Sequence, residues 1–175
     1  MVEKIAHSTE LLTLGKGIIK FDRYDDDGLP TGLRDVGNAP SLNLTVEVET
    51  IEHITSREGI NTIDWTRTKL RRLKGDFELE EFDAENLNLY LFGTRPDGWS
   101  IAPLTSGDLF GKLDFWPMND IGPKYHFQAY VKLSPKGSLG LISDDLMKYG
   151  FDFEAQKDES EPDFPYGQLT LIEES

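Results

Sequence analysis

Residues 42–49 alternate strictly between apolar and polar side chains, and this pattern constrains the fold more than any other feature of the chain. Successive side chains of a β-strand point to opposite faces of its sheet, so the pattern predicts a strand with one buried and one solvent-facing side. The face expected to be buried carries Leu42, Leu44, Val46 and Val48, and the solvent-facing side carries Asn43, Thr45, Glu47 and Glu49. Alternation and turn residues dominate the rest of the chain too, which predicts a mainly β protein.

Five further segments have strand composition between clusters of Gly, Pro, Asp and Asn. They are residues 17–22, 109–115, 125–133, 149–154 and 168–172. The first of them leads into a turn at residues 25–28, after which Pro30 and Gly32 precede a return towards Val36. A first β-hairpin is therefore expected near the start of the chain.

A second hairpin is expected around Lys74-Gly75, taken as a two-residue loop. This register places Leu73 opposite Asp76, Arg71 opposite Glu78, Leu70 opposite Leu79 and Lys69 opposite Glu80. Opposite charges then face each other, which favours this register over its neighbours. A second interpretation of the basic run at residues 67–74 stays open, in which its side chains meet an acidic surface on another copy of the protein.

One short helix is expected after the acidic run at residues 76–85. Asp83 has the chemistry of an N-cap, with Phe82 before it and Leu87 four residues after it placed as a hydrophobic staple. Leu87, Tyr90 and Leu91 share one helical face, which we expect to pack on the sheet. Gly93 suits the left-handed residue that ends a helix.

Composition excludes several classes of protein. The chain has no Cys, so disulfides, thiolate nucleophiles and Cys-ligated metal sites are absent. Eighteen Lys and Arg stand against 32 Asp and Glu, and a net charge of −14 repels nucleic acid and anionic membranes at long range. No segment has the 18 or so apolar residues of a membrane span. We expect a single domain over residues 1–175, with residues 1–13 as a flexible N-terminal arm.

A search for chemistry finds no catalytic, cofactor-binding or metal-binding constellation. Gly15-Lys16-Gly17 precedes a strand, whereas phosphate-binding glycine loops follow one. If Gly28 is placed at position six of a calcium-binding loop, the two anchoring positions become Arg23 and Arg34, so a solvated turn is favoured. His7, His53 and His126 share no ligand spacing. We therefore expect no enzymatic activity, no cofactor and no metal.

The order and spacing of several segments resemble one family. Residues 21–28 with Gly32, residues 36–40 leading into the strand at 42–47, the stretch 49–60, the helical residues 84–93 and residues 131–145 resemble, in turn, segments of the tail tube (major tail) proteins of long, non-contractile-tailed bacteriophages. The resemblance covers most of the chain from about Leu14 onward. The basic run at 67–74 and the insertion at 94–107 depart from the family pattern.

The resemblance implies a fold of two packed antiparallel β-sheets, sandwich-like or barrel-like, with one short flanking helix and a long inter-strand loop. It implies a structural virion protein, assembled in the host cytoplasm into the tail, whose homohexameric rings stack into a hollow tube. Tape-measure and tail-end proteins are the implied partners, and DNA passes through the tube without specific binding. Membrane binding is not expected.

The resemblance also implies roles for particular residues. The residues expected from it at contacts between subunits or rings are Ile51, Glu52, His53, Ile54, Arg57, Glu58 and Ile60. Arg67 and Arg72 are added to these contacts by the second interpretation of the basic run, in which it meets an acidic surface on another copy. Glu47 and Glu49 are expected to face the lumen, where sixfold repetition would form rings of carboxylates that repel a phosphate backbone. Two alternatives stay open: a tube subunit of a contractile tail or secretion machine, and a stand-alone acidic β-sandwich binding module.

Overall fold

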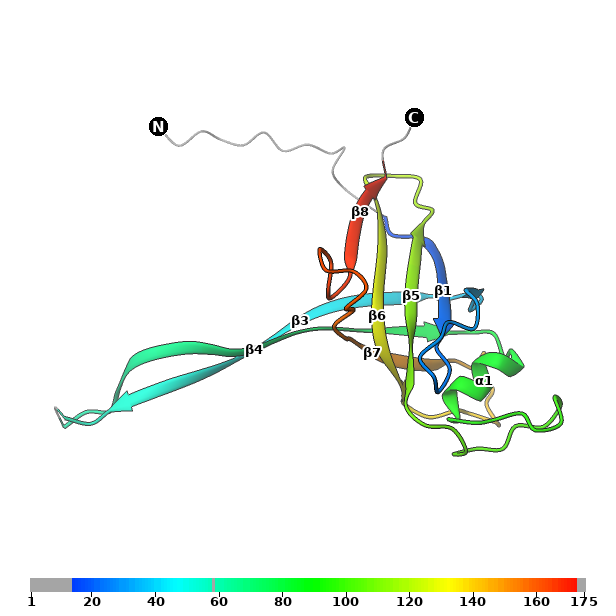
Figure 1. Ribbon diagram of the computed structural model, residues 1–175, viewed down its shortest axis with the longest axis horizontal. Helices are drawn as coiled ribbons and strands as arrows, with labels where there is room; N and C mark the ends of the chain where they lie inside the picture. The colour runs from blue at the N-terminus through cyan, green and yellow to red at the C-terminus, as the bar shows by residue number, and fades with distance from the viewer. Residues whose placement is uncertain (1–13, 58, 173–175) are drawn as a thin grey trace.

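The computed structural model describes residues 14–57 and 59–172 (Figure 1). The expectation of a mainly β fold with one short helix is confirmed. The elements are β1 (Gly17–Arg23), β2 (Arg34–Asp35), β3 (Ser41–Thr55), β4 (Thr62–Leu79), α1 (Ala84–Tyr90), β5 (Leu109–Pro117), β6 (Lys124–Lys136), β7 (Tyr149–Ala155) and β8 (Gln168–Ile172). All strand pairs are antiparallel, and the first hairpin is present as the pairing of β1 with β2.

The strands form one continuous sheet in the order β2-β1-β5-β6-β7-β4-β3, and it does not close into a barrel. Strand β6 joins two layers, because its first half pairs with β8 and its second half pairs with β7. In Figure 1, β1, β5, β6 and β8 run across the direction of β3, β4 and β7. The two layers expected from the sequence are therefore parts of a single hydrogen-bonded sheet that folds over itself.

One apolar core contains side chains from both layers and from α1. Its members include Ile19, Phe21, Phe77, Leu79, Leu89, Tyr90, Leu109, Leu113, Phe127, Val131, Leu133, Tyr149, Phe151 and Phe153. Aromatic rings form much of it: the Phe77 ring stacks on Phe151 with centroids 5.3 Å apart. This core holds the end of β4 next to β7, so the body fixes the direction in which β4 leaves it.

The hairpin expected at Lys74-Gly75 is wrong, because both residues lie inside the single long strand β4. A Cβ atom on Gly75 would lie 2.2 Å from the Asn43 carbonyl oxygen and 2.2 Å from Cζ of Phe153. Glycine is needed there so that a core ring and a neighbouring strand can approach, and no turn is involved. Two of the basic residues pair instead with carboxylates of β3 and β7: Arg72 contacts Glu49 and Glu154, and Lys74 contacts Glu47.

The helix begins as expected, since the Asp83 side chain accepts a hydrogen bond from the Glu85 backbone N–H. Its buried apolar residues are Leu89 and Tyr90, while Leu87 is only half-buried. The left-handed residue after the helix is Phe92, with φ of 47°, and the expectation for Gly93 is wrong. Gly93 lies instead where a Cβ atom would meet Ile101 at 2.7 Å.

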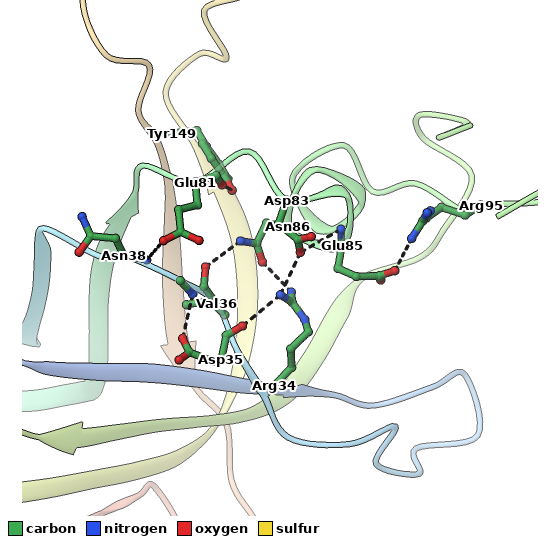
Figure 2. Close-up of polar contacts among 11 residues, drawn as sticks. Arg34, Asp35, Val36, Asn38, Glu81, Asp83, Glu85, Asn86, Arg95 and Tyr149 are labelled. Atoms are coloured by element: carbon green, nitrogen blue, oxygen red, sulfur yellow. Dashed lines mark hydrogen bonds and ion pairs between the residues drawn. The ribbon is translucent and has the colours of Figure 1, made fainter. Parts of the chain in front are cut away.

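A polar network attaches the start of α1 to the strand β2 (Figure 2). The Arg34 guanidinium donates to Asn86 Oδ1 at 2.6 Å and to Asp83 Oδ2 at 3.2 Å. Asn86 is fully buried and donates to the Val36 carbonyl at 2.8 Å. Burial raises the pKa of Tyr149, whose hydroxyl donates to the Glu81 carbonyl. These bonds fix the helix against the sheet edge that lies opposite β3.

The close approach at Gly75 generates a stability prediction. Gly75→Ala should lower the free energy of unfolding by about 1–3 kcal/mol, because the added methyl overpacks against Phe153 and the Asn43 carbonyl. Gly107→Ala is the matched control, since nothing lies within 4 Å of its Cβ position and its φ is not left-handed. Urea denaturation measures the free energy of unfolding of both variants. An unchanged free energy of unfolding for Gly75→Ala would contradict this packing.

Candidate assembly surface

Strands β3 and β4 continue far beyond the body as a two-stranded hairpin (Figure 1). They pair with each other from Ser41 opposite Glu78 to Thr55 opposite Thr62, whereas β7 pairs with β4 only between Lys74 and Leu79. Residues 46–73, here called the projecting hairpin, therefore lack a third strand within the described part of the chain. The segment expected as a long loop is mostly regular strand, and only residues 56–61 connect β3 to β4.

The apolar face predicted for the start of β3 exists, but the expectation that it is buried is wrong. Leu42 packs against the core, whereas Leu44, Val46 and Val48 are 44%, 67% and 51% exposed. Alternation identifies which side of a strand is apolar, but it does not say what covers that side. Here β3 extends past the edge of the core, so the described chain leaves more than half of the surface of Val46 and Val48 exposed.

Both faces of the projecting hairpin carry exposed apolar side chains. Paired residues of antiparallel strands share a face, so Ile54 and Ile63 lie together on the face of Val46 and Val48. Ile51 and Trp65, each 49% exposed, lie on the opposite face. A two-stranded hairpin of this kind is marginally stable in water by itself, so burial of these side chains against another surface would stabilise it.

Glu47 and Glu49 lie on the face of β3 opposite Val46 and Val48, as the alternation predicts. Both are paired with cations of β4: Lys74 lies 2.5 Å from Glu47, and Arg72 lies 3.9 Å from Glu47 and 3.5 Å from Glu49. The Lys74 ammonium beside it lowers the pKa of the Glu47 carboxyl. Positive charge on β4 thus lies beside both carboxylates, which weakens the field of a carboxylate ring.

The structure gathers most of the expected contact residues on the projecting hairpin. Ile51, Glu52, His53, Ile54, Arg57, Ile60 and Arg67 lie along it, Arg72 lies at its base, and Glu58 lies outside the described residues. His53 Nδ1 lies 2.7 Å from Asp64 Oδ1. Four apolar members of the surface were not among the expected contacts: Val46, Val48, Ile63 and Trp65. The alternation of side chains along β4 could have revealed Ile63 and Trp65, but register shifts at Lys69 and Asp64 interrupt it.

A polar cluster on β5 and β6 is the other arrangement with the residue types of a reactive site. Asp114 accepts a hydrogen bond from Gln128 Nε2 at 2.5 Å and lies 3.1 Å from His126 Nε2, while the Trp116 ring packs edge-on against His126. Both carboxylate oxygens of Asp114 thus contact side chains of the neighbouring strand β6, and the cluster links the two strands. Among residues 14–57 and 59–172, no group of His, Asp and Glu is arranged to hold a metal ion. Within the same ranges, no helix is long and apolar enough to cross a membrane.

The fold and this surface define a class: a mainly β protein with a projecting hairpin that carries exposed apolar and charged side chains. Residues 12–98 match the model of a family described as "Protein of unknown function UCP028589". No curated protein matches the sequence.

Solved structures that are similar to nearly the whole chain include two from tail-type particles. One is titled "Tail of empty GTA particle computed with helical refinement, C6 symmetry", with 14% identity, a TM-score of 0.38 and coverage of 96% of this chain and 99% of that chain. Another is titled "Cryo-EM structure of the anti-feeding prophage (AFP) baseplate, 6-fold symmetrised", with 9% identity, a TM-score of 0.45 and coverage of 92% and 95%. Both titles describe particles with sixfold symmetry.

The exposure of β3 generates a prediction about the monomer. Val46→Thr and Val48→Thr should change the free energy of unfolding by less than about 0.5 kcal/mol, because both side chains already face water. Val131→Thr, at a fully buried position, should cost about 1–3 kcal/mol for its enclosed hydroxyl. Urea denaturation of dilute protein tests the pair, and equal costs at Val48 and Val131 would show that β3 is covered in the monomer.

Proposed function

We propose that this protein is a structural tail protein whose copies form hexameric rings that stack into a hollow tube. The observation that carries the proposal is the projecting hairpin, with exposed apolar side chains on both faces and no third strand beside it among the described residues. The hairpin includes the stretch 49–60 that resembles an inter-strand segment of tail tube proteins. The order of the other segments that resemble this family supports the same conclusion.

The geometry of the hairpin suits assembly of identical subunits. Ten residues of β3, from 46 to 55, span about 30 Å at the usual rise of a strand, which is enough to reach across a neighbouring subunit. A surface that binds a different surface on the next copy makes a heterologous contact, and such contacts close into rings or continue as stacks. A hairpin directed away from its own body can make such a contact with a neighbour, because its own core does not cover it.

The charge of the protein suits a wall past which DNA moves. At −14 overall, a ring of copies repels the phosphate backbone over roughly a Debye length, about 8 Å at physiological salt. We place Glu47 and Glu49 on the lumen side, with Lys74 and Arg72 moderating their charge. The proposal includes tape-measure and tail-end proteins as partners, location in the virion tail and assembly in the host cytoplasm.

Assembly of the purified protein over a concentration series tests this function. Light scattering and negative-stain microscopy should detect sixfold rings and stacked tubes. The variant Ile51→Ser/Ile54→Ser/Ile60→Ser should remain a folded monomer that cannot polymerise, because its hairpin has lost apolar area to bury.

The matched control is Thr50→Ser/Thr62→Ser/Thr66→Ser, which installs the same residue at three positions of the same hairpin without removing a large apolar side chain. This control should form normal tubes. Normal tubes from the isoleucine variant would contradict the assigned role of the hairpin. A wild-type protein that stays monomeric at every concentration would favour a stand-alone binding module.

A further inference from the structure

The outer part of the projecting hairpin, residues 50–73, and the rest of the protein carry charge of opposite sign. Residues 50–73 contain five Arg and Lys and three Asp and Glu, a formal charge of +2. The whole chain carries −14, so the remaining residues carry −16. Glu47 and Glu49 at the base of the hairpin balance this excess, so residues 46–73 are neutral as a whole and only the outer part is basic. A basic outer part on an acidic body is an arrangement in which two copies attract each other when the outer part of one hairpin approaches the body of the other.

Three cations of the hairpin take no part in ion pairs within the described residues. Arg67, Lys69 and Arg71 are exposed, and none has a carboxylate within ion-pair distance there. Arg72, one residue further along, contacts Glu47, Glu49 and Glu154 and so helps to hold the base of the hairpin. The three unpaired cations are therefore available to a partner.

The shape of β4 favours contact through the faces of the hairpin. Two register shifts in the pairing with β3 leave Lys69 and Asp64 as extra residues on β4. Bulges and charged side chains on an open strand edge hinder the addition of another strand. The faces carry no such obstacle: Arg71 lies opposite Val48 on one face, and Arg67 lies opposite Ile51 on the other. Each face therefore combines exposed apolar side chains with an unpaired cation.

We propose that the projecting hairpin docks face-on against the acidic body of a second copy of this chain. Apolar side chains such as Val48, Ile54 and Ile63 hold the contact, and Arg67, Lys69 and Arg71 supply the attraction that brings the copies together. This rests on the proposed function, because it takes the partner to be another copy. The new element is the attraction between the hairpin cations and the carboxylates of the body, which determines where the hairpin binds.

A second copy fits this surface better than a nucleic acid does. Cations that bind a phosphate backbone must overcome the field of a body that carries −14 outside residues 46–73, whereas the same body attracts the basic outer part of the hairpin. The body also supplies exposed carboxylates without an ion pair in the described chain, among them Asp26, Asp27, Glu159 and Glu161. The apolar side chains between the cations match a protein surface, which can bury them.

The response of assembly to salt tests the proposal. Rising salt weakens the attraction between opposite charges, which slows assembly. It also weakens the repulsion between two copies of charge −14, which speeds assembly. The test variant is Arg67→Gln/Lys69→Gln/Arg71→Gln. The matched control is Lys16→Gln/Lys20→Gln/Lys112→Gln, which also changes the net charge from −14 to −17 but lies outside the hairpin.

Growth from wild-type seeds is followed by light scattering between about 50 and 500 mM NaCl, a range over which the Debye length shortens from over 10 Å to below 5 Å. We expect the hairpin variant to elongate roughly tenfold more slowly than the control at low salt, and the difference to disappear at high salt. Circular dichroism verifies that both variants are folded. Equal elongation of the two variants at every salt concentration would overturn the proposal.

The other outcomes separate this proposal from the proposed function. Tubes with identical salt responses would leave the tube function standing and refute the charged docking. Association that depends on the hairpin cations but yields no rings would support the charged docking and refute the tube function. A wild-type protein that never associates refutes both. Binding of duplex DNA that requires Arg67, Lys69 and Arg71, with unchanged self-association, would identify a nucleic acid as the occupant and overturn the proposal.

Discussion

A two-stranded ribbon has no interior, and this constraint governs the whole molecule. Strands β3 and β4 leave the body with apolar side chains on both faces, and residues 14–57 and 59–172 leave Val46, Ile54 and Trp65 exposed. Apolar area left in water costs about 25 cal/mol per Å², so a partner surface that covers this area stabilises the hairpin and the complex together. This exposed apolar area is what the proposed contact with another copy would bury.

The body provides the rigid base that such a projection needs. The core rings of Phe77, Phe151 and Phe153 pack around β4 where Gly75 allows the closest approach, and Arg72 links the base to both neighbouring strands. The helix is held at the far edge of the sheet by Arg34 and Asn86. Because the base is fixed on both sides, the direction of the hairpin is determined by the fold, and identical copies present it identically.

Local signals were sufficient for much of the fold. The strand segments follow from composition and turn residues, and Asp83 caps its helix through a bond to a residue two positions away. Lys74-Gly75 misled because the need for glycine arises from Phe153, which is distant in the sequence and close in space. The exposure of Val46 and Val48 could not be inferred, because alternation identifies the apolar face of a strand but not whether another part of the protein packs on it. The length of the hairpin was hidden by the register shifts at Lys69 and Asp64, which interrupt the period of two.

Amide hydrogen exchange tests the central claim, that the projecting hairpin is completed by another chain, most directly. The backbone amides of residues 50–55 and 62–68 should exchange rapidly in dilute monomer and should be protected at least about 100-fold in assembled protein, because a covered ribbon no longer opens freely. Amides of β6 and β7 in the core, such as those of Val131 and Phe151, should be strongly protected in both states. Hairpin amides as well protected as these in dilute monomer, or unchanged upon assembly, would contradict the account.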